Sequence, residues 1–214
     1  MKPNEYQGKE IVITYDAERC IHVKECIRGA PSTFSASAQP WVTPDGTDAK
    51  TLAAVIRKCP SGALHYQPTE KSLTETPGIT NSVSVQPDGP LYVRGNISLR
   101  DGDSTLHDTR MALCRCGASA RKPFCDNSHF AVTFLDPAIT PPGPDAHTEM
   151  ATTSKLMIDP THDGPLHLQG QITIRNSYDQ VIFEGVETWL CRCGHSGNKP
   201  FCDGSHERAG FKAE

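Results

Sequence analysis

A group of four potential metal ligands occurs twice in this 214-residue chain with the same spacing. Each group has three cysteines and one histidine in the pattern C-x-C-x8-C-x3-H, which spans sixteen residues. The first group is Cys114, Cys116, Cys125 and His129, and the second is Cys191, Cys193, Cys202 and His206. Corresponding positions all lie 77 residues apart. Because thiolate and imidazole are common ligands of zinc and of iron-sulfur clusters, the duplicated pattern predicts two metal centres.

The residues between these ligands extend the pattern. The second copy reads CRCGHSGNKPFCDGSH and includes Ser196, Pro200 and Asp203. It resembles the CDGSH iron-sulfur domain family (mitoNEET-like), and this resemblance implies a [2Fe-2S] cluster in each copy, held by the three cysteines and the histidine. The first copy has Asn127 where the family has glycine. Asparagine tolerates a positive φ better than most non-glycine residues, so we expect the same turn there.

The other three cysteines lie in the N-terminal part of the chain, at Cys20, Cys26 and Cys59. The segment from residue 10 to residue 67 resembles the single-cluster bacterial ferredoxins, mainly through these cysteines and the Cys-Pro-Ser-Gly-Ala-Leu run that begins at Cys59. The ordinary four-iron pattern is C-x2-C-x2-C with a remote Cys-Pro, but here the middle cysteine is replaced by Val23. Three thiolates suit a [3Fe-4S] cluster. The alternative is a [4Fe-4S] cluster whose fourth iron takes water or His22.

Cysteines in such a chain could also serve two other purposes. The count of nine is odd, and no secretion signal accompanies it, so a disulfide framework is the weaker interpretation. Zinc is the main alternative in the duplicated sites, because three cysteines and one histidine are an ordinary zinc set. Zinc sites usually use C-x2-4-C pairs, however, and C-x-C is tighter than that.

These segments predict an α+β protein with three domains. A ferredoxin-like module covers residues 5–70, and two β-rich CDGSH domains cover residues 80–135 and 154–214. Polar, proline-containing connectors at 67–78 and 136–153 separate them. Each repeat is too small to bury a core alone. Because family members with one motif form homodimers, the resemblance implies that the two repeats form an intramolecular pseudo-dimer in a monomeric chain.

Local patterns predict the main elements. In the N-terminal module we expect strands at 11–15, 41–43 and 63–66, a short helix before Pro31, and a helix over 48–58 with Thr47 as its N-cap. In the repeats we expect strands at 91–93, 96–100, 166–168 and 171–174. We further expect Asp126 and Asp203 to cap short helices that carry the ligand histidines.

Composition and the motifs that the sequence lacks narrow the range of functions to consider. The net charge is −4 and no run of basic residues occurs, which argues against nucleic acid as a partner. No apolar stretch is long enough to span a membrane, so we expect a soluble, cytoplasmic protein. The sequence has no catalytic triad, phosphate loop or flavin motif, so we expect no enzyme. The leading hypothesis is one-electron transfer to redox partner proteins. The alternatives are a redox or iron-sulfur sensor that passes clusters to apo acceptor proteins and a zinc-binding interaction scaffold.

Overall fold

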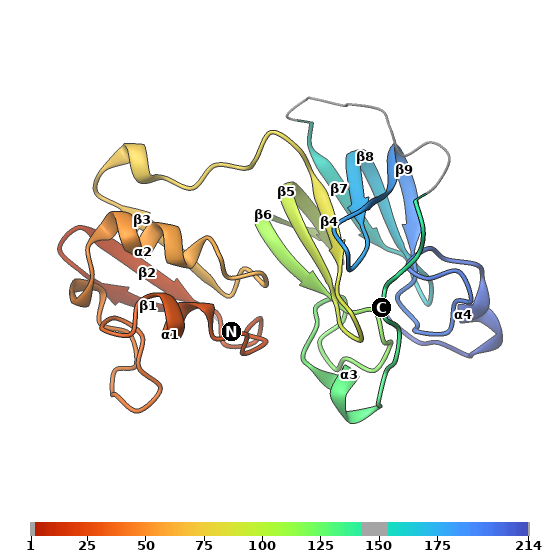
Figure 1. Cartoon of the computed structure of the whole chain (residues 1–214), viewed down its shortest axis with the longest axis horizontal. Coiled ribbons are helices and arrows are strands. Elements are labelled where there is room, and N and C mark those ends of the chain that lie inside the picture. Colours follow the sequence, from red (N-terminus) through yellow and green to blue (C-terminus); the bar gives the residue numbers. More distant parts are fainter. Residues whose placement is uncertain (1–2, 143–153, 214) are drawn as a thin grey trace. The chain divides into compact units, whose positions relative to one another are not determined.

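The computed structural model describes residues 3–142 and 154–213 (Figure 1). It divides into two compact units, Met1–Thr76 and Pro77–Glu214, with both predicted CDGSH repeats in the second unit. Strands dominate and the helices are short, which confirms the α+β class. Part of the connector predicted at 136–153 lies outside the described residues.

The first unit is built on a three-stranded antiparallel sheet in the order β1-β2-β3. Its strands are β1 (Asn4–Gln7), β2 (Ile11–Tyr15) and β3 (Leu64–Pro68). Its helical elements are α1 (Glu25–Gly29), η1 (Pro44–Gly46), α2 (Ala49–Ile56) and η2 (Lys71–Leu73). The central strand β2 has the predicted bounds, because its β-branched residues alternate between a buried and a half-buried face.

Helix α2 covers the core of this unit. Its apolar face buries Leu52 and Ile56 completely, in one cluster with Ile13 of β2. The helix begins one residue later than predicted, because the side chain of Asp48 accepts a hydrogen bond of 2.8 Å from the Thr51 N–H. The prediction of Thr47 as the cap was therefore wrong.

The strand predicted at residues 41–43 was also wrong. Only an isolated bridge between Phe34 and Val42 forms there. Trp41 instead packs its ring edge-on against Tyr15, with ring centroids 4.7 Å apart. Aromatic and β-branched content alone suggested a strand, but no neighbouring strand extends far enough to form a ladder.

The second unit contains one six-stranded sheet to which both repeats contribute. The first repeat (residues 82–142) supplies β4 (Ser82–Val85), β5 (Leu91–Asp101) and β6 (Ser104–Leu113). The second repeat (residues 154–213) supplies β7 (Leu156–Pro160), β8 (Leu166–Arg175) and β9 (Val181–Leu190). Strand β4 pairs with its own β5 and, in parallel, with β8 of the other repeat. Strand β7 likewise pairs with its own β8 and, in parallel, with β5.

Beta-bulges join the short strands predicted in each repeat. Strands 91–93 and 96–100 form the single strand β5, whose register shifts between Arg94 and Ile97, and β8 has the matching shift after Gln169. Gly95 lies in the first bulge with φ +144°, and a β-carbon there would lie 2.9 Å from the Cα of Asn81. This glycine permits the close approach of the segment that leads into β4.

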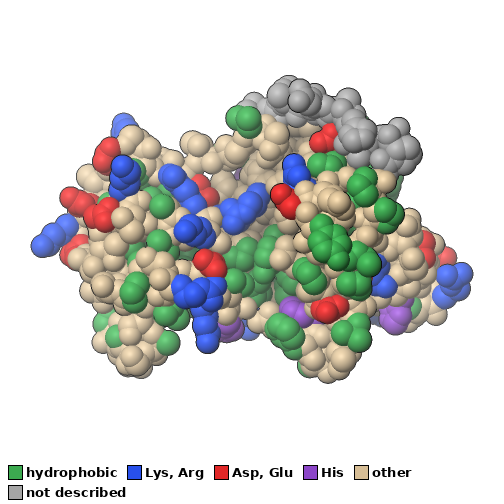
Figure 2. All heavy atoms as spheres, viewed as in Figure 1, with side chains coloured by type: hydrophobic (Ala, Val, Ile, Leu, Met, Phe, Trp, Pro, Cys, Tyr) green, Lys and Arg blue, Asp and Glu red, His purple; other side chains and the backbone are tan. Residues whose placement is uncertain are grey.

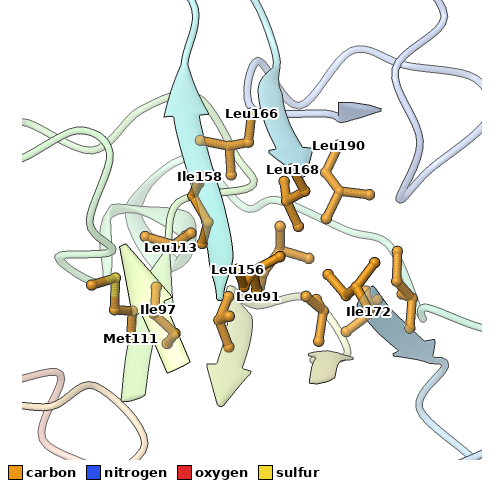
Figure 3. Packing of buried hydrophobic residues seen from close by; sticks show 14 of the residues in the cluster. Leu91, Ile97, Met111, Leu113, Leu156, Ile158, Leu166, Leu168, Ile172 and Leu190 are labelled. Carbon is orange, nitrogen blue, oxygen red and sulfur yellow. The ribbon is translucent and has the colours of Figure 1, made fainter. Parts of the chain in front are cut away.

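The core of the second unit belongs to both repeats (Figure 3). Buried side chains from the first repeat meet those of the second, and those labelled in Figure 3 are Leu91, Ile97, Met111, Leu113, Leu156, Ile158, Leu166, Leu168, Ile172 and Leu190. Apolar side chains also reach the surface, among them Phe130 and Leu135, and the face in Figure 2 has basic and acidic groups intermixed. Within the described ranges, no helix is long and apolar enough to cross a bilayer.

Candidate metal centres

The last strand of each repeat leads directly into a C-x-C pair. Strand β6 ends at the residue before Cys114, and β9 ends at the residue before Cys191. The loop then returns beside the strand: the Cys114 N–H donates to the Pro123 carbonyl at 2.8 Å, and the Cys125 N–H donates to the Ala112 carbonyl at 2.9 Å. The second copy repeats both bonds at the corresponding residues. Each loop is therefore anchored by backbone hydrogen bonds, and its ligands have defined positions.

A short helix holds each histidine that is predicted to be a ligand. These helices are α3 (Ser128–Ala131) and α4 (Ser205–Arg208). The preceding residues, Asn127 and Gly204, have φ values of 72° and 81°. The prediction that Asn127 adopts the left-handed turn is confirmed.

The predicted capping aspartates connect each helix to the opposite side of its loop. Asp126 accepts hydrogen bonds from the Ser128 N–H at 3.0 Å and from the Ala120 N–H at 2.8 Å. Burial would raise the pKa of Asp126, but hydrogen bonds, chiefly from Ser128, outweigh this effect and hold it below its usual range. Asp203 makes the same two kinds of bond to Ser205 and Gly197. Both carboxylates therefore have a structural role.

The ligands of the first site form two pairs. The Sγ atoms of Cys114 and Cys116 lie 3.8 Å apart, and Cys125 Sγ lies 3.5 Å from His129 Nδ1. A tetrahedral ion with bonds of about 2.3 Å to sulfur and about 2.0 Å to nitrogen separates two sulfurs by about 3.8 Å and sulfur from nitrogen by about 3.5 Å. Each pair therefore fits one metal ion. In the second site the Sγ atoms of Cys191 and Cys193 lie 3.7 Å apart.

The pairs do not merge into a four-ligand site around one point. Among the described Cys, His, Asp and Glu residues, no group of three or more could hold a single metal ion. A mononuclear zinc site requires all four ligands around one ion, whereas a [2Fe-2S] cluster requires two ligands on each of two irons. At the first site, the donor set and its two-plus-two arrangement fit the cluster.

The surroundings of the thiols favour a cationic centre. Burial raises the pKa of Cys125 and that of Cys193 to about 11, because a bare thiolate is poorly solvated there. The hydrogen bond from Cys114 lowers the pKa of Cys116 to about 7. Backbone N–H groups also point at sulfur, including that of Asn127 at 3.4 Å from Cys125 Sγ. Metal charge stabilises such thiolates, and N–H groups of this kind tune a cluster's potential.

The N-terminal cysteines come together although the last lies 39 positions after the first. Cys20, Cys26 and Cys59 line one cavity together with Tyr15 and His22. His22 has φ 54°, and its Nδ1 lies 3.8 Å from Cys20 Sγ. Burial raises the pKa of Cys26, and the neighbouring thiols of Cys59 and Cys20 raise it further. The three thiols thus form a third group, with His22 beside Cys20.

Comparison with known proteins assigns these segments. Residues 88–130 and 163–207 both match the family described as iron-binding zinc finger, CDGSH type, and residues 6–69 match the family described as divergent 4Fe-4S mono-cluster. The chain therefore contains two CDGSH-type domains and, at its N-terminus, a domain that matches the divergent mono-cluster family. It is therefore an iron-sulfur protein.

The chain also has curated relatives. It is 39% identical over 62 residues to the uncharacterized protein YjdI of Escherichia coli K12, a match that covers 29% of this chain and 82% of YjdI. The YjdI of Escherichia coli O157:H7 matches to the same extent.

Sequence analysis did not single out two buried residues in the predicted metal-binding loops. Arg115 and Arg192 lie between the cysteines of each C-x-C pair, and their side chains are fully buried. Their recurrence 77 residues apart was the available signal. The two loops also touch, because Gly117 packs on the backbone of Cys193 and Gly194 packs on that of Cys116.

Proposed function

We propose that this CDGSH protein is a one-electron carrier with two [2Fe-2S] clusters and one N-terminal cuboidal cluster. The main support is the two-plus-two arrangement of thiolates and imidazole at the first CDGSH site, where Cys114 pairs with Cys116 and Cys125 pairs with His129. When bound, such a cluster accepts and releases single electrons. The loops supply the ligands, backbone N–H groups and low solvent exposure that set its potential.

Histidine ligation has a defined effect on this chemistry. A neutral imidazole in place of a thiolate makes the site less negative by one charge, which favours reduction, as in Rieske centres. His129 is 6% exposed and lies in contact with Phe130, with ring centroids 4.2 Å apart. This packing fixes the ring with Nδ1 toward Cys125.

For the N-terminal domain we propose a [3Fe-4S] cluster on Cys20, Cys26 and Cys59, one thiolate for each iron. The family description names a four-iron cluster, and in that alternative the fourth iron takes His22 or water. Separate irons of a cube hold their ligands far apart, whereas His22 Nδ1 lies only 3.8 Å from Cys20 Sγ. This short separation favours the three-iron form.

We also propose that the CDGSH repeats form an intramolecular pseudo-dimer in a monomer. Support comes from the reciprocal pairing of β4 with β8 and of β7 with β5, which gives each repeat a strand of the other as a neighbour. A carrier rather than an enzyme is proposed because three ligand groups account for all nine cysteines. All nine are free thiols, as is usual in a reducing compartment such as the cytoplasm.

The test is metal and sulfide analysis of anaerobically purified protein, with EPR before and after dithionite. We expect about seven irons per chain, with a paramagnetic three-iron signal before reduction and [2Fe-2S] signals after it. About eight irons without the first signal would replace the three-iron proposal with the four-iron form. Colourless protein with stoichiometric zinc would refute the carrier.

Cluster donation to an apo protein is the second candidate. It is favoured by the second CDGSH site, where Cys202 and His206 are only half-buried and so within reach of a partner. Replacing His206→Cys separates the two functions. A carrier keeps transferring electrons at a lowered potential, whereas a donor loses cluster transfer because the thiolate binds iron more firmly. His129→Cys is the matched variant at the buried site.

A further inference from the structure

Two of the predicted ligand thiols in the N-terminal domain have a polar side chain beside them. His22 Nδ1 lies 3.8 Å from Cys20 Sγ, and Ser61 Oγ lies 3.6 Å from Cys59 Sγ. His22 is exposed to solvent, whereas Ser61 is only 3% exposed. Because a hydrogen bond is electrostatically stronger where water is excluded, the contact between Ser61 and Cys59 is the better placed of the two to influence a cluster.

Several hydrogen bonds hold Ser61 in this position. Its carbonyl accepts a bond of 2.8 Å from Nη2 of Arg19, the residue that precedes Cys20. Its Oγ accepts the Ala63 N–H at 3.3 Å. The Ala63 carbonyl in turn accepts the N–H of Asp16, the residue after β2, at 2.8 Å. The hydroxyl of Ser61 therefore has a defined place between the cysteine segments and the central strand.

The direction of the bond between Ser61 and Cys59 follows from the chemistry of a cluster ligand. A thiolate that binds iron has no proton, so the sulfur of Cys59 can only accept. The hydroxyl of Ser61 has one proton and two lone pairs, and one lone pair takes the Ala63 N–H. Its proton is thus available for the sulfur, and the bond is O–H···S.

The corresponding serines of the CDGSH loops use their hydroxyl protons differently. Ser119 Oγ donates to the Phe124 carbonyl at 2.7 Å, and the second loop repeats this bond at the equivalent residues. The proton of Ser119 is therefore not available for a thiol. Backbone N–H groups approach the sulfurs there, such as that of His195 at 3.4 Å from Cys193 Sγ. At Cys59 the donor is a side chain, so a single substitution can remove it.

A hydrogen bond to a cluster sulfur favours the reduced state. Reduction adds one electron from a one-electron donor, makes and breaks no bond, and increases the negative charge on the cluster and its thiolates. The hydroxyl of Ser61 directs the positive end of its dipole at the sulfur of Cys59, so it stabilises this added charge. The effect is the same in a [3Fe-4S] and a [4Fe-4S] cluster, because Cys59 is a ligand in both.

We propose that Ser61 raises the reduction potential of the N-terminal cluster by donating its hydroxyl proton to the Cys59 thiolate. This inference rests on the proposed function. Ser61 acts through Cys59 and is therefore a positioning residue, whose role is to set the potential at which the N-terminal cluster exchanges electrons.

The test is an anaerobic redox titration of the full chain, followed by EPR. Cys59→Ser identifies the wave of the N-terminal cluster, because that wave disappears with the cluster. In Ser61→Ala we expect the midpoint of the same wave to fall by at least a threefold change in the reduction equilibrium, or about 28 mV for a one-electron couple. The waves of the CDGSH sites should not move, since their ligand groups do not include Ser61.

Two further variants separate the hydrogen bond from packing. Ser61→Thr keeps a hydroxyl and should retain the wild-type potential. Ser37→Ala removes an exposed hydroxyl of the same domain, which lies 3.2 Å from Ser35 Oγ, and should also leave the potential unchanged. An unchanged potential in Ser61→Ala with full iron content would overturn the inference, as would an equal fall in Ser61→Thr.

The wild-type protein supplies a second measurement, which decides the question if Ser61→Ala does not hold its iron. A hydroxyl proton exchanges with D2O much faster than a hydrogen-bonded backbone N–H. Pulsed EPR after a brief transfer into D2O should therefore show the loss of a proton coupling to the N-terminal cluster, and unchanged couplings would overturn the inference. Absence of iron from the wild-type protein would instead refute the proposed function, so the two failures are distinct.

Discussion

Gly194 packs against Cys116 of the other repeat so closely that a β-carbon at position 194 would lie 2.6 Å from the Cys116 carbonyl oxygen. Gly117 has the reciprocal relationship with the Cys193 carbonyl. Both glycines have positive φ, of 84° and 80°. The contact between the two metal-binding loops thus depends on two residues that carry no side chain.

Replacing Gly194→Ala should therefore destabilise the protein strongly. Alanine adds a left-handed strain of about 1–2 kcal/mol and an overlap with rigid backbone that costs about 1–3 kcal/mol more. Gly204→Ala is the control, because Gly204 has φ +81° but nothing within 4 Å of its β-carbon position. We expect thermal unfolding of the loaded protein to show a clearly larger decrease for Gly194→Ala. Equal decreases would contradict the close packing.

Asn81 connects the two repeats through its buried side chain. Its Nδ2 donates to the carbonyls of Ser154 at 2.8 Å and Gln171 at 2.9 Å, and its Oδ1 accepts the Asn96 N–H at 2.9 Å. Asn81→Ala should lower the free energy of unfolding by about 2–4 kcal/mol, because it removes the bonds of three backbone groups in partly buried residues. Gln86→Ala, which removes one local bond of 3.4 Å, should cost much less in the same denaturant titration. Similar losses in both variants would argue against the bridging role.

Replacing one predicted ligand should remove iron from its own ligand group and leave the other two groups loaded. No residue is shared between them, so Cys116→Ser and Cys193→Ser should each lose about two irons per chain, and Cys59→Ser about three. Metal analysis with EPR of each purified variant measures this. A Cys59→Ser variant that lost irons from the CDGSH sites as well would show that the groups are not independent.

The N-cap of α2 distinguishes two adjacent residues. Asp48→Ala should lower the thermal midpoint by several degrees, because it removes the acceptor of the Thr51 N–H. Thr47→Ala should have little effect, and Asp48→Asn should keep most of the stability, since asparagine caps equally well. A larger effect of Thr47→Ala would contradict the observed cap.

Local order was predictable where neighbouring residues decide it. The alternation in Ile11–Tyr15 predicts β2, and the small φ penalty of asparagine predicts the left-handed turn at Asn127. The predicted N-cap of α2 was wrong by one residue. Thr47 and Asp48 are both good N-cap residues, and only the backbone conformation in the folded protein selects Asp48. The strand predicted at residues 41–43 does not form, because a strand needs neighbouring strands to pair with and its own sequence does not specify them.

The sequence by itself was enough to predict the three ligand groups, because each CDGSH set lies within sixteen residues and the other three cysteines match a known cluster pattern. Tertiary structure alone decided how the repeats combine. Strands β4 and β7 were not predicted, since their parallel pairing with the other repeat depends on contacts between residues far apart in the chain. It also decided that Arg115 pairs with the carboxylate of Asp136, whereas Arg192 Nη1 has no hydrogen-bond partner among the described residues. Folding brings such charged residues together, and their spacing along the chain does not predict the contact.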